Sequence, residues 1–158
     1  MARPRYLEDF APEETFATGS YTVDLEEVTG FAAEHDPQYF HTDPERAKAH
    51  PIFRGVSASG FLTMSITHRL ILALDLGQAW GMIGKGIDNL RWRRPVRPGD
   101  TLRARGKVLS VTPQPDQGFG IVTTAVETLN QHGETVMSFV VHGVVPSRFA
   151  LAPTAEAA

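Results

Sequence analysis

The chain has 158 residues, of which 42% are hydrophobic and 21% charged, as expected for one globular domain with its own core. Its formal net charge of −3 gives no general attraction to nucleic acid or anionic membranes, and the absence of cysteine excludes disulfides, thiol nucleophiles and thiolate metal sites. The N-terminus lacks the apolar run of a secretory signal, so we expect a cytoplasmic protein.

The first predicted helix begins after Asp24, which forms a capping box with Glu27 ahead of a helically spaced apolar series. It should stop near His35, because Pro37 disfavours helical backbone at the residue before it. Asp36 is therefore expected at the exit of a helix, on rigid but irregular backbone.

A second, short helix is expected to begin at Thr42 or Asp43, with Pro44 at its first position. His41 falls just before that start. Asp36 and His41 should therefore both lie on a connection between helices. Taken alone, an Asp before a Pro and a His before a helix are also common turn and capping chemistry.

The third predicted helix is the long one, over about residues 60–76, with Ser59 as its N-cap and Gly77 ending it. Its apolar residues fall on nearly every side. Such a helix belongs in a core rather than on a surface. We expect a sheet to wrap around it.

From Trp80 onward the pattern is that of strands. The predicted strands cover residues 86–94, 101–111, 119–129 and 134–145. The first two are separated by a turn at 95–100, and the last two by NQHG, a hairpin signal. One buried helix with a largely antiparallel sheet predicts an α+β fold.

Three segments of the chain resemble those of the MaoC-like acyl dehydratases, which include the (R)-specific enoyl-CoA hydratases. They are DPQYFHTDPERA, RGVSASGFLTMS and RRPVRPGDTL. The resemblance runs from about Tyr21 to Val145 and implies a single hotdog domain over 1–148, a long antiparallel sheet wrapped around a central helix. The remaining residues, 149–158, are small and polar and are expected to be disordered.

The resemblance implies that Asp36 and His41 are the catalytic pair that holds and activates a water. It also implies that the backbone N–H of Gly60 binds the thioester oxygen, with Ser59 and Ser65 near the site. Two departures are visible: the family's His-Gly is Ser59-Gly60 here, and its Asp-x-Asn-Pro-x-His is DPQYFH. A branched, aromatic or functionalised acyl group is therefore as compatible as a straight chain.

The same residues suit the chemistry of water addition to an α,β-unsaturated thioester. A carboxylate and an imidazole that share one water can supply the base and the acid. Free N–H groups at a helix N-terminus can stabilise the enolate oxygen. The expected activity is that of a hydro-lyase interconverting 2-enoyl-CoA and 3-hydroxyacyl-CoA.

Two other functions remain open. A hotdog acyl-CoA thioesterase often carries an acid on the central helix, but residues 60–74 contain none. A non-catalytic acyl-CoA-binding or pairing subunit would not need to retain both Asp36 and His41.

Seven of the fifteen basic residues fall within seventeen positions, on two predicted strands linked by a short turn. They are Arg91, Arg93, Arg94, Arg97, Arg103, Arg105 and Lys107. If the two strands pair, their basic side chains approach one another on one face, where an anion or an acid such as Glu127 should balance them. Arg91, Arg93, Arg94, Arg103 and Arg105 are candidates for binding the phosphates of coenzyme A. A solvated outer face of the sheet is the alternative.

No histidine pair has convincing metal-ligand spacing, so we predict no metal and no cofactor beyond the coenzyme A of the substrate. A lone sheet leaves an edge strand open. We therefore expect a homodimer or a higher homo-oligomer, with an acyl-CoA thioester as substrate and neither nucleic acid nor membrane as a partner.

Overall fold

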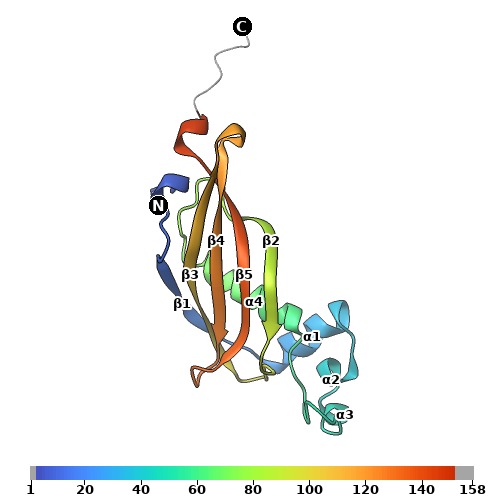
Figure 1. Cartoon of the computed structure of the whole chain (residues 1–158). Helices are drawn as coiled ribbons and strands as arrows, with labels where there is room; N and C mark the ends of the chain where they lie inside the picture. Colours follow the sequence, from blue (N-terminus) through green and yellow to red (C-terminus); the bar gives the residue numbers. More distant parts are fainter. Residues whose placement is uncertain (1–2, 152–158) are drawn as a thin grey trace.

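The computed structural model describes residues 3–151, which form one antiparallel sheet crossed by one long helix (Figure 1). The sheet has five strands in the order β1-β3-β4-β5-β2. Their bounds are β1 Thr15–Thr22, β2 Ile83–Trp92, β3 Thr101–Gln114, β4 Phe119–Leu129 and β5 Thr135–Pro146. The α+β class and the four strands of the second half are confirmed. Strand β1 was not predicted.

Short 3-10 helices lie at Leu7–Asp9, Pro115–Gln117 and Arg148–Leu151. The last of these overlaps the start of the tail predicted to be disordered, and residues 152–158 of that tail lie outside the described residues. Among the helices of residues 3–151, none is long and apolar enough to cross a membrane.

The strands on either side of the 95–100 turn do not pair with each other, so the condition for their basic side chains to share one face is not met. β2 is hydrogen-bonded to β5 at one edge of the sheet, whereas β3 lies between β1 and β4. The connection does not fold back because it docks on the core: Val96 is buried, and its carbonyl accepts from the Ala58 amide at 2.8 Å. The chain therefore crosses the end of the sheet between the two strands.

The first helix, α1 (Leu25–His35), has the predicted bounds. The Asp24 carboxylate caps it by accepting from the Glu27 amide at 2.7 Å, and Asp36 follows its last residue. The second predicted helix is α3 (Pro44–Ala47), capped by Asp43.

His41 does not lie on irregular chain as predicted but inside a one-turn helix, α2 (Tyr39–Thr42). This turn forms because the carbonyl of Gln38 accepts from the His41 amide at 2.9 Å and the Thr42 amide at 3.1 Å. Helices α2 and α3 project together beyond the end of the sheet (Figure 1).

The central helix, α4, spans Gly60–Leu72 with Ser59 as the predicted N-cap, and it ends four residues earlier than expected. The apolar pattern continues past Leu72, but the backbone does not. The amides of Leu74 and Asp75 bond to carbonyls only three residues back, and Asp75 then takes a left-handed φ of 46°.

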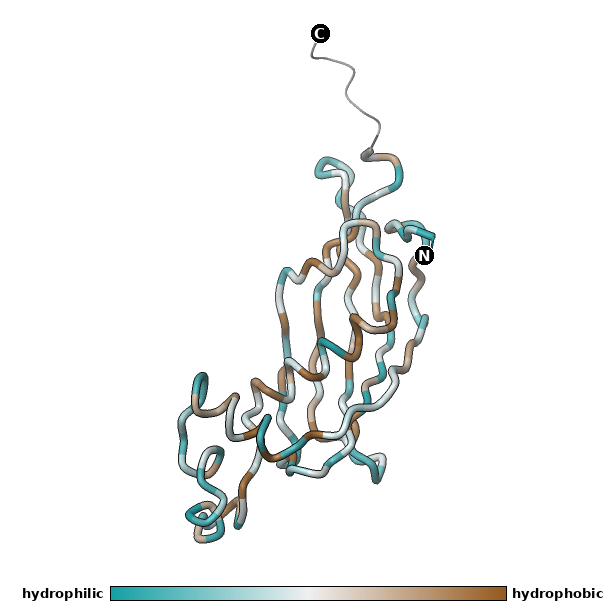
Figure 2. The backbone as a smooth tube through the Cα atoms, turned by 180° about the vertical axis from the view of Figure 1, so that it is seen from behind, coloured by the Kyte–Doolittle hydropathy of each residue, from teal (hydrophilic) through white to brown (hydrophobic). Residues whose placement is uncertain are grey.

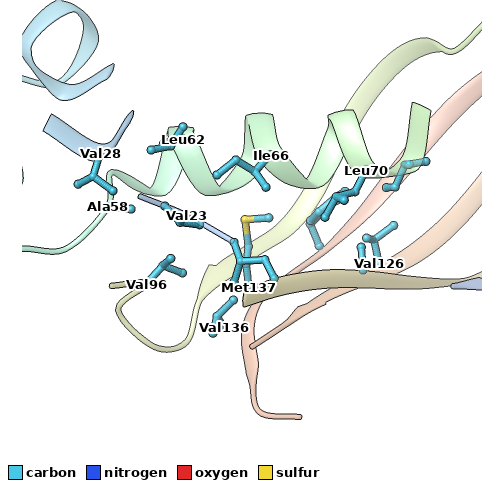
Figure 3. Close-up of a cluster of buried hydrophobic side chains, with 14 residues drawn as sticks. Val23, Val28, Ala58, Leu62, Ile66, Leu70, Val96, Val126, Val136 and Met137 are labelled. Atoms are coloured by element: carbon cyan, nitrogen blue, oxygen red, sulfur yellow. The ribbon is translucent and has the colours of Figure 1, made fainter. Parts of the chain in front are cut away.

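The predicted arrangement of a long antiparallel sheet around a central helix is confirmed: the sheet packs on one face of α4, and within this chain the other face of the helix is open. Figure 2 shows α4 running across the front of the strands. Its buried face packs on a core that includes Leu62, Ile66 and Met137 (Figure 3). The opposite face carries Phe61 and Leu72, which are 60% and 48% exposed. The same face also carries the exposed polar side chains of Ser65, His68 and Arg69, so its surface is of mixed polarity.

Candidate active site

The end of α1, the short helix α2 and the start of α4 meet at one end of the core. There the structure brings the predicted pair together: Nε2 of His41 lies 3.4 Å from Oδ2 of Asp36. The His41 side chain is 7% exposed and that of Asp36 is 18% exposed. The separation is longer than a direct charge-assisted hydrogen bond, so the contact leaves both atoms available to a third group.

The His41 ring is oriented by the backbone behind it. Its Nδ1 lies 2.7 Å from the carbonyl oxygen of Ser57. A carbonyl can only accept, so Nδ1 carries the hydrogen, and in the neutral ring Nε2 has the free lone pair. His41 therefore presents a proton acceptor toward Asp36.

Asp36 is held by two side-chain donors. Gln38 Nε2 donates to Oδ1 at 2.7 Å, and the Ser59 hydroxyl donates to Oδ2 at 2.7 Å. Burial raises the pKa of this carboxyl, but the bonds from Gln38 and Ser59, together with the positive charge that His41 carries when it is protonated, outweigh it. The pKa of Asp36 lies below its ordinary value, so Asp36 is an ionised acceptor.

Ser59 also connects Asp36 to the N-terminus of α4. Its Oγ accepts from the Phe61 amide at 3.3 Å while donating to Asp36. Within residues 3–151 the amide of Gly60 makes no hydrogen bond. This free N–H lies at the positive end of the helix dipole, where it can bind a developing oxyanion.

A glycine is required at position 60 because the Trp92 side chain lies against its backbone. A Cβ there would overlap the indole of Trp92, whose Nε1 donates to the Gly60 carbonyl at 3.1 Å. The Phe61 and Trp92 rings meet edge to face with centroids 5.7 Å apart.

These groups line one cavity of about 460 Å³. Asp36, His41 and Gly60 supply its polar centre, and most of the rest is apolar. The apolar lining includes Phe40, Ile52, Phe53, Phe61, Trp92 and Val136. A cavity of this size with a few convergent polar groups is typical of a site for a small organic ligand.

The order of the strands places some of the predicted phosphate-binding arginines at the cavity and the others far from it. Arg93 and Arg94 line the cavity, whereas Arg91, Arg103 and Arg105 do not. Arg91 is exposed on β2 and donates to its own neighbour's carbonyl, that of Leu90. Arg103 and Arg105 lie on β3, three strands away from β2. They do not approach Arg91 and Arg93, and Arg105 instead pairs at 2.7 Å with Glu127, the acid expected to balance it.

Ser65 also lies outside the cavity lining, on the open side of α4, where its hydroxyl donates to the Phe61 carbonyl at 2.9 Å. Among the described residues, no group of three or more histidines and carboxylates is placed to hold a metal ion. The absence of a metal and of a cofactor stays a prediction.

Three residues that contact the predicted site residues were not predicted from the sequence. Gln38, which bonds to Asp36, has a local signal, because it lies only two residues beyond the carboxylate. Ser57 and Trp92 act through a backbone carbonyl and a ring face, and no residue pattern marks either role.

Residues 9–130 match the MaoC like domain family. The crystal structure of a MaoC-like dehydratase from Rhodospirillum rubrum superposes with a TM-score of 0.85 and 41% identity, covering 91% of this chain and 98% of that one. The 3-hydroxyacyl-thioester dehydratase Z of Mycobacterium tuberculosis is 36% identical over 109 residues, 68% of this chain and 70% of that protein.

The predicted hotdog fold is confirmed by a more distant likeness. A Mycobacterium tuberculosis protein with a double hotdog fold superposes with a TM-score of 0.75 at 17% identity, covering 98% of this chain and 47% of that one. At this identity the likeness concerns the fold alone.

Proposed function

The chain belongs to the MaoC-like dehydratase family, and from this membership and the site we propose that it adds water to, or removes it from, an acyl thioester. The reaction interconverts a 2-enoyl-CoA and a 3-hydroxyacyl-CoA. The observation that carries the proposal is the close approach of His41 Nε2 to Asp36 Oδ2, at 3.4 Å, beside the free Gly60 amide.

In the proposed reaction one water binds beside the pair, within hydrogen-bond reach of both His41 Nε2 and Asp36 Oδ2. The Nε2 lone pair of His41 takes a proton from the water as its oxygen attacks C3 of the enoyl group. Asp36 stays ionised and orients the water by accepting its other hydrogen. Electrons move from the double bond onto the thioester oxygen, which the Gly60 N–H stabilises; such a donor is worth roughly 100- to 1,000-fold in rate. The proton on His41 then passes to C2, so the atoms of water are fully accounted for.

The thioester is proposed to carry coenzyme A. Arg93 and Arg94 line the cavity, and within residues 3–151 Arg94 is the one of the two that has an acid partner, Glu134 at 3.5 Å. Guanidinium groups bind phosphate through paired hydrogen bonds. Arg103 and Arg105 lie too far along the sheet to share this role within one chain, so the phosphate proposal rests on Arg93 and Arg94.

A second copy of the chain is proposed to cover the open side of the molecule. Strand β2 has a hydrogen-bonded neighbour on one side only, and its Ile83 and Ile87 are 43% and 48% exposed. The open face of α4, with Phe61 and Leu72, adds to this apolar surface. The exposed edge of a sheet is usually paired with a strand of another chain or covered by another element. Light scattering on the intact protein tests the homodimer, and Ile87→Lys should shift it toward monomer.

The activity is tested with crotonyl-CoA, by following loss of the enoyl thioester absorbance. The wild-type protein should hydrate it, and Asp36→Asn should lower kcat by roughly 1,000-fold, since an amide neither carries the charge nor accepts from both donors. Release of free coenzyme A without hydration would instead indicate a thioesterase. Binding without turnover would indicate a non-catalytic acyl-CoA-binding subunit.

A further inference from the structure

One arginine outside the cavity holds the loop that leads into α4. Arg97 lies in the turn between β2 and β3, and its guanidinium donates to three backbone carbonyls of that loop. It bonds to Gly55 and Val56, both at 2.9 Å, and also to Phe53. The planar guanidinium holds its donors in a fixed geometry, whereas the three donors of a lysine ammonium rotate on a flexible stem.

The turn that carries Arg97 is itself fixed to the body of the protein. The carboxylate of Asp100 accepts from the Arg97 amide at 2.8 Å and from Gln131 Nε2 at 2.9 Å. The Gly99 amide donates to the carbonyl of the fully buried Val23 at 2.6 Å. The guanidinium therefore extends from an anchored base, so that it can restrain the loop rather than follow it.

The loop that Arg97 holds contains a residue in a strained backbone conformation. Arg54 has a left-handed φ of 52°, which is costly for a residue with a side chain. The three carbonyls that Arg97 binds lie on both sides of this residue.

The loop leads directly to the groups that orient His41. The next residue is Ser57, whose carbonyl accepts from His41 Nδ1 and whose amide donates to the Phe40 carbonyl at 3.1 Å. At the other end of the loop, the Phe53 ring lines the cavity and stacks on Phe40 with centroids 5.0 Å apart. A shift of the loop would move both the acceptor behind His41 and a wall of the cavity.

We propose that Arg97 is a positioning residue for the hydration reaction: it holds residues 53–56 so that the Ser57 carbonyl keeps the hydrogen of His41 on Nδ1. Arg97 does not line the cavity, so it acts only through this loop. The inference rests on the proposed function for its kinetic consequence, but not for its effect on the His41 ring.

The kinetic test compares Arg97→Ala and Arg97→Lys with the wild type, using crotonyl-CoA. Small misplacements of catalytic groups cost up to about 100-fold in rate. We expect kcat to fall roughly 10- to 100-fold in Arg97→Ala, with KM changed less than about threefold, and an intermediate value in Arg97→Lys. Millimolar guanidinium ion should restore part of the kcat of Arg97→Ala. Arg148→Ala is the matched control, because it removes another half-buried arginine, one that pairs with Asp9 at the opposite end of the sheet. It should neither lose kcat nor respond to guanidinium.

A second measurement does not depend on activity. Nitrogen NMR of the protein labelled at histidine should show His41 protonated at Nδ1 in the wild type and a mixture of tautomers in Arg97→Ala, or in Arg97→Lys if the alanine variant does not fold. An unchanged tautomer, together with a kcat loss that guanidinium does not reverse, would overturn the proposal. If the wild type does not hydrate crotonyl-CoA, the proposed function fails while the tautomer comparison still decides the role of Arg97.

Discussion

The part of the chain that the structure describes contains two aspartate–histidine pairs, and the closer pair is not the one in the cavity. His142 on β5 and Asp88 on β2 lie 2.8 Å apart, whereas His41 and Asp36 are separated by 3.4 Å. The His142 ring is also bonded on its other nitrogen, at 3.1 Å from the hydroxyl of Thr123. By distance alone, Asp88 and His142 would be the better-connected pair.

The surroundings of the two pairs favour Asp36 and His41 instead as the candidate catalytic pair. The Asp88 side chain is 69% exposed, against 18% for Asp36. Buried and half-buried residues alternate along β4, so Thr123 and its bonded partner His142 lie on the sheet face opposite α4. That face offers neither the cavity nor a free helix amide, and water screens its charges. In the 2.8 Å contact the Nε2 of His142 is already hydrogen-bonded to Asp88, so it is not free to bind a water.

From this difference we infer that an acid–base pair is a candidate catalyst when one of its polar atoms has no hydrogen-bond partner within the protein. In the surface pair, both histidine nitrogens already have partners. In the cavity pair, Ser57 fixes one nitrogen of His41, and two donors fix Asp36, so the lone pair of Nε2 stays available. Matched substitutions in the two pairs test this distinction.

The largest effect is expected from replacing the two histidines by glutamine. His41→Gln removes the proton acceptor and should lower kcat with crotonyl-CoA by roughly 1,000-fold. His142→Gln keeps a polar side chain on an exposed face and should leave kcat within about twofold, with stability changed by less than ~1 kcal/mol. Comparable losses of kcat in both variants would show that the cavity does not distinguish the pairs.

A smaller effect is expected at the helix N-terminus, which only the cavity pair has. In Gly60→Ala the new methyl group overlaps the Trp92 indole, which must move and give up its bond to the Gly60 carbonyl. Overpacking of this kind costs about 1–3 kcal/mol. We expect kcat to fall about 100-fold and tryptophan emission to shift to longer wavelength.

The control for that variant is Gly30→Ala. Gly30 lies in α1 with nothing within 4 Å of an added Cβ, and alanine is the better helix former by up to ~1 kcal/mol. It should be slightly stabilised and fully active. Wild-type kcat in Gly60→Ala would show that the contact between Gly60 and Trp92 does not position the helix amide for the reaction.

What could be predicted from the sequence is local chemistry. Asp24 and Ser59 cap α1 and α4 as expected, because a capping side chain bonds to amides two or three residues away. Asp36 and His41 come together because only five positions and one proline separate them. These relations need no knowledge of distant parts of the chain.

What could not be predicted depends on long-range packing. The basic residues of β2 and β3 were expected on one face, but β2 pairs with β5, and strand neighbours are not encoded in a turn between them. Arg97 belonged to the same basic series, yet its partners lie 41 to 44 residues away in the sequence. The C-terminus of α4 was misplaced because the apolar pattern does not reveal the left-handed backbone at Asp75.

The smallest and most diagnostic effect is expected from Ser59→Ala, which removes a donor to Asp36 while leaving both members of the pair in place. The pKa of Asp36, now below its ordinary value, should rise, because one of the bonds that favour the charged form is lost. The acidic limb of the kcat/KM profile should therefore move to higher pH, with kcat at neutral pH reduced about tenfold or less. Loss of the helix cap should cost ~1 kcal/mol of stability.

The pH dependence of unfolding separates the two roles of Ser59. A carboxyl whose pKa is lower in the folded state stabilises the protein above its unfolded pKa of about 3.9, and this contribution is lost as the pH falls through the folded value. Ser59→Ala keeps less of it, so the stability difference from wild type should be largest at pH 7 and should narrow below about pH 4. Ser65→Ala, which removes a hydroxyl on the open side of α4, should show no such pH dependence. A pH-independent difference for Ser59→Ala would mean that Ser59 only caps the helix and that the pKa of Asp36 is set without it.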